Sequence, residues 1–286
     1  MPFLTDLRNR FDDICMERFV GVKRLETFYV ELEIPNPVGP PIYAHLHRPL
    51  ASTADAGVVM VPGGVNAGTV FDHSLGVTAL DVASMGFSVL HYDPSGRGKT
   101  GGCEDHWGPI HQKELAAVIK CFSMLPGVKE DNISIFSFSI GICIAAGALS
   151  RYPLPGIRLL FDWEGPSNRF NITRNDTHPP LRQKPCCDVS FWREREPSRS
   201  IGLIACGYFR YQGQRDHMQG RYKGHAIELV NLATQGRARW TRLNGNLPNT
   251  FLNENKINQY DWVPAHQNHK WQVLKYFLDA QRLAEK

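Results

Sequence analysis

A serine that could act as a nucleophile lies in the stretch Asn132 to Leu149, which reads NISIFSFSIGICIAAGAL. β-Branched and aromatic residues fill its first half, and alanine, glycine and isoleucine fill its second, so we expect a buried strand, a tight turn and a helix. Ser139 falls in the turn within SFSIG, which departs from the pattern Gly-x-Ser-x-Gly because Ser137 replaces the first glycine. An ordinary serine in a strand-to-helix turn fits this short pattern equally well, so the surrounding elements must decide.

Apolar runs alternate with amphipathic segments along most of the chain. Strands are predicted at residues 56–61, 87–92, 133–138, 157–161, 203–211 and 238–243, and helices at about 71–85, 111–125, 140–149, 225–234 and 270–283. This alternation predicts an α/β fold with a mostly parallel central sheet and helices on both faces. Two alternating runs, FYVELEIPNP and IYAHLHRPL, precede it and predict an antiparallel hairpin.

Two segments lie outside this alternation. Residues 1–25 contain a predicted N-terminal helix, and residues 166–200 are polar, proline-containing and aromatic at intervals, which predicts a lid or cap inserted over one edge of the sheet. The sequence contains neither an internal repeat nor a low-complexity linker. We therefore expect residues 1–286 to form a single domain.

Composition indicates which cellular compartment and which classes of partner to expect. A net charge of +4 is too small to indicate nucleic acid, and no window of about 18 apolar residues predicts a membrane span. The N-terminus has no apolar core of a signal peptide, and seven scattered cysteines are typical of free thiols in a reducing compartment. We expect a soluble cytoplasmic protein that binds neither nucleic acid nor membrane.

The sequence contains no convincing motif for binding a metal or a cofactor. Glu104, Asp105 and His106 form a polar cluster, but no second cluster has the spacing of metal ligands. The glycines at 96 and 98 are part of neither a Walker motif nor a dinucleotide fingerprint. The prediction is therefore no metal and no cofactor.

Ligands of an open parallel sheet bind at the carboxyl ends of its strands. The residues placed there are Gly63, Gly64, Asp93, Ser139, Asp162, Glu164 and Asp216. A serine hydrolase needs a nucleophile, an imidazole that accepts its proton, a carboxylate that orients the imidazole, and N–H donors for the oxyanion. The set contains each of these except the imidazole.

Four sequence blocks carry a resemblance to a known family: VVMVPGG at 58–64, HYDPSGRGKTGG at 91–102, SFSIG at 137–141 and YQGQRDHMQ at 211–219. On these blocks the chain resembles the α/β-hydrolases, and among them the dienelactone hydrolase and prolyl-oligopeptidase-like serine esterases. The resemblance covers roughly residues 56–280. It implies an α/β-hydrolase fold, with Ser139 as the nucleophile and the N–H groups of Gly64 and Ile140 as oxyanion donors.

The same resemblance implies an order of nucleophile, acid and histidine along the chain. Asp216, in the loop after the strand at 203–211, is the favoured acid, and Asp162, close to Glu164, is its rival. No histidine follows the strand at 238–243 directly, so the choice falls on His266. His269 comes next, and further candidates are His217 and His225.

The function that follows is hydrolysis of a carboxylic ester or amide by a Ser-His-Asp triad through an acyl-enzyme, with a small-molecule ester as substrate. The alternative is a binding protein on the same fold that has lost catalysis, which Ser137 and the missing histidine suggest. A third hypothesis keeps the triad for perhydrolysis or carbon–carbon bond hydrolysis, since a fold does not determine its chemistry. Neither the substrate's identity nor a homo-oligomeric state can be read from the sequence.

Overall fold

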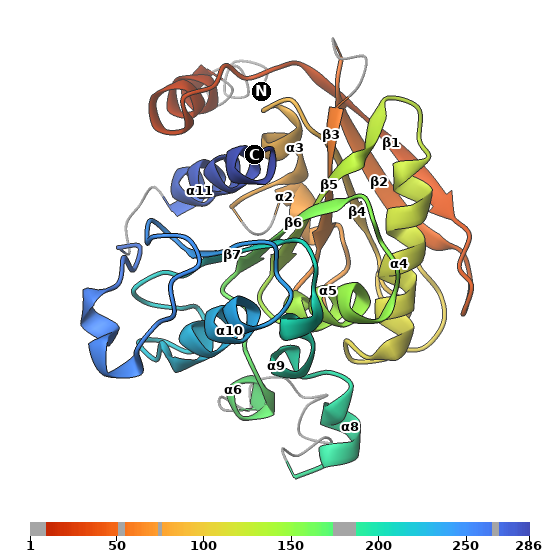
Figure 1. Ribbon diagram of the computed structural model, residues 1–286. Coiled ribbons are helices and arrows are strands. Elements are labelled where there is room, and N and C mark those ends of the chain that lie inside the picture. Colours follow the sequence, from red (N-terminus) through yellow and green to blue (C-terminus); the bar gives the residue numbers. More distant parts are fainter. Residues whose placement is uncertain (1–9, 51–54, 74–75, 174–186, 265–268) are drawn as a thin grey trace.

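The computed structural model describes residues 10–50, 55–73, 76–173, 187–264 and 269–286, which build a central sheet covered on both faces (Figure 1). The eight strands lie in the order β1-β2-β4-β3-β5-β6-β7-β8. Their bounds are β1 (Thr27–Ile34), β2 (Ile42–Pro49), β3 (Asp55–Val61), β4 (Ser88–Tyr92), β5 (Val128–Phe138), β6 (Ile157–Trp163), β7 (Gly207–Tyr211) and β8 (Thr241–Leu243). β2 pairs antiparallel with β1 and β4, while β3 to β8 pair in parallel, which confirms the mostly parallel sheet.

Helices pack on both faces of this sheet and enclose two apolar cores. One face is covered by α4 (Pro109–Ser123), α5 (Gly141–Arg151) and α10 (Gly224–Gln235). The other is covered by η1 (Met16–Val20), α2 (Val70–His73), α3 (Ala79–Ala83) and α11 (His269–Ala284). The central strands are therefore buried from both sides, which explains why their sequences are continuous apolar runs.

The predicted insertion contains short helices that extend from the edge of the molecule (Figure 1). They are α6 (Arg169–Thr173), α8 (Val189–Arg193), α9 (Pro197–Ser200) and η2 (Ile201–Leu203), and a further short helix, η3 (Glu254–Gln259), follows β8. An ion pair of 2.9 Å between Arg195 and Asp105 connects the insertion to the glycine-rich loop after β4. The insertion is thus held against the loops at the carboxyl ends of the strands.

Several predicted boundaries were wrong. The helix expected at 71–85 is two short helices, because Thr78 caps the N-terminus of α3 in a capping box with Asp81. β7 starts only at Gly207, since residues 201–203 form a 3₁₀ turn, and β8 is limited to Thr241–Leu243. In the N-terminal segment the described helical residues are 10–20, and Gly21 ends the helix with a φ of 82°.

The described residues contain free cysteines and helices that are too short or too polar to cross a membrane. The six cysteines that the structure describes are free thiols. Among the helices of the described residues, none combines the length and the apolar character that a membrane span requires.

The core around β5 supplies a stability test. Phe136 is fully buried, and its ring centroid lies 5.0 Å from that of Phe161 and 5.3 Å from that of Phe277. We expect Phe136→Ala to lower the free energy of unfolding in urea by about 3–5 kcal/mol, because it removes a buried ring and leaves a cavity. Met124→Ala is the control, since Met124 is 76% exposed, and it should change stability little. Equal effects of the two substitutions would contradict this description of the core.

Candidate active site

Ser139 lies at the sharp turn between β5 and α5. Its φ of 52° is in the left-handed region, which costs energy for a residue with a side chain and often marks a functional site. The Ser139 N–H donates to the carbonyl of Trp163 at the end of β6, at 2.8 Å. The turn is thus locked to the neighbouring strand with the serine side chain directed out of the sheet, as the sequence predicts.

Two glycines let the end of β3 approach this turn closely. A Cβ atom on Gly63 would lie 2.7 Å from the Phe138 carbonyl oxygen and 2.9 Å from the Ser139 Cβ. A Cβ on Gly141 would lie 2.8 Å from the carbonyl oxygens of Val61 and Pro62. The second glycine of the SFSIG block is therefore required by packing. Ser137, a fully buried residue of β5, occupies the position of the first glycine of the pattern.

The imidazole that contacts Ser139 belongs to His217, in the loop after β7. His217 Nε2 lies 2.9 Å from Ser139 Oγ, and its Nδ1 lies 3.0 Å from Glu164 Oε2. The ring stacks on Phe138, with centroids 5.1 Å apart, and 34% of the side chain is exposed. Ser139, His217 and Glu164 therefore form a continuous hydrogen-bonded chain with the geometry of a serine-hydrolase triad.

Hydrogen bonds to the backbone fix both the main chain and the side chain of Glu164. It follows β6 directly, has a φ of 55°, and donates its N–H to the carbonyl of Tyr211 at 3.1 Å. Its Oε1 accepts the N–H of Gly213 at 2.9 Å, which leaves Oε2 for His217. The carboxylate is buried, so it is positioned with little freedom to move away from the imidazole.

Asp216, the predicted acid, points elsewhere. Its Oδ1 lies 3.7 Å from His217 Nδ1 but accepts the backbone N–H groups of Met218 and Gln219 at 2.7 and 2.9 Å. Burial alone would raise the pKa of Asp216, but the neighbouring histidines 225 and 217 and the Gln219 N–H lower it. In this structure Asp216 shapes the loop that carries His217, and the position next to the imidazole is taken by Glu164.

Asp162, the rival acid, is buried in a structural network. It forms an ion pair with Arg210, another fully buried residue, at 2.5 Å, and it accepts the Tyr208 hydroxyl at 2.7 Å. It also accepts the Gly165 N–H at 3.0 Å. Asp162 therefore anchors the turn that presents Glu164 and does not face Ser139.

Among the other predicted histidines, the two that the structure describes, His269 and His225, contact different groups. His266 lies outside the described residues. His269 begins α11, where its Nδ1 lies 3.2 Å from the Tyr211 hydroxyl. His225 is fully buried, with Nδ1 3.1 Å from the carbonyl oxygen of Gly165. His217 was named only as a further candidate, although it directly follows Asp216 in the sequence.

The glycine-rich loop after β4 supports the Gly64 side of the site. The Gly64 carbonyl accepts hydrogen bonds from Arg97 Nη1 at 3.1 Å and from Trp107 Nε1 at 2.6 Å. Arg97 is itself paired with both carboxylate oxygens of Glu104, at 2.6 and 2.7 Å. These contacts fix the peptide at Gly64, where φ is 57°, beside the Ser139 turn. The oxyanion role of the Gly64 and Ile140 N–H groups stays a prediction.

A small pocket of about 30 Å³ opens beside the serine. Its lining residues are Ser139, Ile140, Glu164, Pro166, Asn171, Ile172, Met218 and Gln219. Two of them, Asn171 and Ile172, come from α6, so the insertion contributes to the wall. The apolar side chains of this wall suit a small organic group.

Glu164, Asp216 and His217 also lie close enough together to be considered as metal ligands. A neutral imidazole has one N–H and one lone pair. In His217 the Nδ1–H is directed at Glu164, and the Nε2 lone pair faces the Ser139 hydroxyl. Both ring nitrogens are thus used by the serine chain, which favours proton transfer over metal binding here.

Buried basic groups surround the loop that carries His217. Lys223 Nζ donates to the Gly213 carbonyl at 2.6 Å, and burial lowers the pKa of Lys223 to about 8. Burial likewise lowers the pKa of His225 to about 3, with the charge of Arg210 acting in the same direction. His225 Nε2 lies 3.4 Å from Asp216 Oδ2, so a neutral imidazole packs against the carboxylate that shapes the loop.

Comparisons with known proteins identify similar folds. No model of a known protein family and no curated protein matches the chain. Among solved structures, an esterase of Pyrococcus furiosus is similar with a TM-score of 0.61 and 17% identity, over 90% of this chain and 91% of the esterase.

Two longer proteins are also similar. A puromycin hydrolase matches with a TM-score of 0.66 and 15% identity, and a putative dipeptidyl aminopeptidase IV from Bacteroides ovatus with 0.64 and 12%. These matches cover 91% and 93% of this chain but only 39% and 36% of the other proteins. The chain therefore spans well under half the length of these two, and it shares the fold of the matched part.

The neutral His225 predicts how stability depends on pH. The unfolded chain binds a proton at this histidine below about pH 6.5, whereas the folded chain does so only near pH 3. Its contribution to stability is therefore complete above pH 6.5 and is lost as the pH falls toward 3, by up to about 1.4 kcal/mol per pH unit. Urea unfolding at a series of pH values should give a shallower acid dependence for His225→Gln than for the wild type. Parallel curves for the two proteins would contradict this assignment.

Proposed function

We propose that this chain, which has the α/β-hydrolase fold expected from its sequence, is a serine hydrolase of carboxylic esters or amides. The observation that carries the proposal is the hydrogen-bonded chain Ser139–His217–Glu164 on a strained turn. Fold likeness alone would not suffice, because one fold hosts many activities. The arrangement of the three side chains is what a serine nucleophile requires.

The reaction uses each group in a defined role. His217 Nε2 accepts the proton of Ser139 Oγ as the oxygen attacks the carbonyl carbon of the substrate, and Glu164 stabilises the resulting imidazolium through Nδ1. The N–H groups of Gly64 and Ile140 stabilise the oxyanion of the tetrahedral intermediate. His217 then returns the proton to the leaving alcohol or amine, and an acyl-enzyme remains on Ser139. Water activated by the same imidazole hydrolyses it.

A carboxylic ester of small size is the favoured substrate class. The pocket beside Ser139 is narrow and largely apolar, which suits a short acyl group better than a peptide. The matched esterase has 91% of its length covered, whereas more than half of the puromycin hydrolase and of the putative aminopeptidase lies outside the match. Both observations support an esterase acting on small molecules.

The alternative of a binding protein without catalysis loses its main support. That alternative rests on Ser137 in place of the first glycine and on the absence of a histidine directly after the strand at 238–243. His217, 78 residues after Ser139, supplies an imidazole from the preceding loop instead.

A fluorophosphonate probe and p-nitrophenyl esters of graded chain length test the proposal. Ser139→Ala should abolish labelling, and Ser139→Ala or His217→Ala should lower kcat/KM by about 10⁴–10⁶-fold, since the members of a triad act as a unit. Glu164→Gln should lower kcat/KM by about 10⁴-fold, because the amide cannot stabilise the imidazolium.

Matched variants distinguish the assignments. Asp216→Asn also removes one carboxylate charge, at the residue before His217. It should lower kcat/KM far less than Glu164→Gln, since Asp216 accepts hydrogen bonds from the backbone of its own loop. His266→Ala and His269→Ala should keep most of the activity. Labelling that survives Ser139→Ala, or activity that disappears with His266→Ala but not with His217→Ala, would refute the triad.

The close approach of β3 supplies a second test. In Gly63→Ala the added methyl group would lie within 3 Å of Phe138 and Ser139, so the turn or the Gly64 loop must move. We expect kcat for an ester substrate to fall by about 10²–10³-fold, as for the loss of one oxyanion donor. Gly202→Ala is the matched control for a glycine-to-alanine change, because Gly202 does not have a left-handed φ and an added Cβ there would meet no atom closer than 3.3 Å. Unchanged kcat in Gly63→Ala would exclude this loop from the site.

A further inference from the structure

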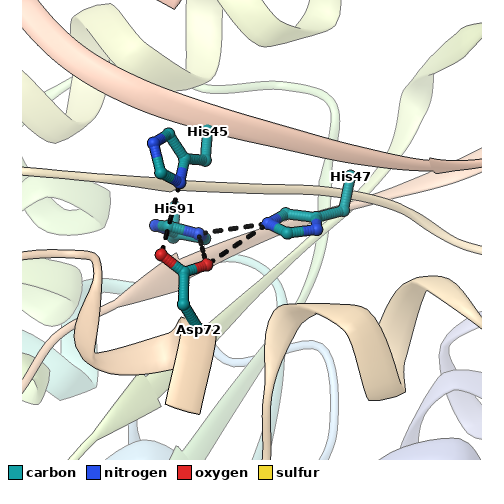
Figure 2. A group of neighbouring side chains, drawn as sticks. All are labelled: His45, His47, Asp72 and His91. Carbon is teal, nitrogen blue, oxygen red and sulfur yellow. Dashed lines mark hydrogen bonds and ion pairs between the residues drawn. The ribbon is translucent and has the colours of Figure 1, made fainter. Parts of the chain in front are cut away.

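A second group of polar side chains lies on the sheet face covered by α2 and α3. It comprises His45 and His47 of β2, His91 of β4 and Asp72 of α2, and we call it the histidine cluster (Figure 2). His45 and His47 are two residues apart on one strand, so both point to the same face. His91 pairs directly with His45 across the antiparallel ladder. Sheet geometry therefore brings the three imidazoles together.

The ligand atoms of this cluster have the spacing of a metal site. His47 Nε2 and His91 Nε2 are 3.3 Å apart, and Asp72 Oδ1 lies 3.0 Å from His91 Nε2 and 3.5 Å from His47 Nε2. His45 Nδ1 lies 3.3 Å from Asp72 Oδ2. Zinc bonds of about 2.0–2.2 Å in a tetrahedron place neighbouring ligand atoms about 3.3–3.5 Å apart. The three separations among His47 Nε2, His91 Nε2 and Asp72 Oδ1 are close to this value, and a ligand atom of His45 lies within 4.8 Å of those of the other residues.

The environment also suits a bound ion. His91 is 1% exposed and His47 is 8% exposed, so water cannot surround these rings. His45, through its other nitrogen, lies 2.8 Å from the Tyr43 hydroxyl. A partner of this kind fixes the ring and directs the remaining nitrogen toward a metal. The cluster opens into a groove that gives an ion a path of entry and whose other lining residues are Thr27, Phe28, Tyr29, His73 and Leu80.

Hydrogen bonding to Asp72 satisfies this arrangement only in part. The Nε2 atoms of His47 and His91 lie 3.3 Å apart and both approach Asp72 Oδ1, so two N–H groups would compete for one carboxylate oxygen. A single histidine would suffice to hold the Asp72 carboxylate. Three imidazoles around one carboxylate are instead the donor set that zinc and related transition metals prefer.

We propose that the histidine cluster binds one Zn²⁺ ion through His47 Nε2, His91 Nε2 and Asp72 Oδ1, with His45 Nδ1 as the fourth ligand. The sequence suggested no metal because its ligands are spread over residues 45 to 91 and have no compact spacing. None of the four residues lines the pocket at Ser139. The ion joins β2, β4 and α2, so its role is structural and does not depend on the proposed hydrolase activity.

Equilibrium dialysis of the full chain, without a histidine tag and stripped with a chelator, tests the site directly. We expect one Zn²⁺ retained per chain, a higher temperature of unfolding with Zn²⁺ than without it, and visible absorption of the Co²⁺-loaded protein characteristic of tetrahedral nitrogen and oxygen ligands. A wild-type chain that retains no Zn²⁺ would overturn the proposal.

Single variants locate the ion. His47→Ala and Asp72→Asn should each weaken Zn²⁺ binding by more than about 100-fold, since changes even in the outer shell of a metal site cost 10–100-fold. His73→Ala is a stringent control, because the exposed His73 lines the same groove next to Asp72 but is not among the four residues of the cluster. Circular dichroism establishes that each variant is folded, and Asp72→Asn keeps the size of the side chain if His47→Ala does not fold. Binding that is unchanged in both ligand variants, or lost equally in His73→Ala, would refute the site.

Discussion

The close contact of three strand ends is the constraint on which the candidate active site depends. The turn at Ser139 is pressed between the ends of β3 and β6: Gly63 and Gly141 leave no room for a side chain on the β3 side, and the Trp163 carbonyl accepts the Ser139 N–H on the other. Backbone strain at Ser139 persists because these contacts leave no alternative conformation. The same contacts bring Gly64 and Glu164, which follow those strands, to either side of the serine.

Much of the fold follows from local sequence patterns. Strands buried on both faces, such as β3 and β5, have continuous apolar runs, and the residues at their carboxyl ends could be named by position alone. Element boundaries were less accessible. The break between α2 and α3 depends on the capping box of Thr78 and Asp81, a start signal that a broad helical pattern concealed. Similarly, β8 is short because only residues 241–243 pair with β7.

The position of Ser139 in a strand-to-helix turn was predictable from the sequence, but the side chains that contact it were less so. Asp216 and His217 are adjacent, yet hydrogen bonds turn the carboxylate toward its own loop and leave the imidazole to Ser139. No sequence pattern distinguishes these outcomes, because they depend on the path of one loop. The histidine cluster was likewise only partly predictable from the sequence. The spacing of His45 and His47 places both on one face of a strand, but His91 and Asp72 join them only through strand pairing and the position of α2.

The origin of His217 has a consequence for how such sequences are classified. The three groups of the candidate triad come from the loops after β5, β6 and β7, so all three precede β8 in the chain. The segment after β8 contributes no group to this triad among its described residues, but Asn244 and Val263 hydrogen-bond the loop that carries His217 through Gln212 and Gln214. A rule that demands a histidine after the last strand would classify proteins of this kind as degenerate enzymes.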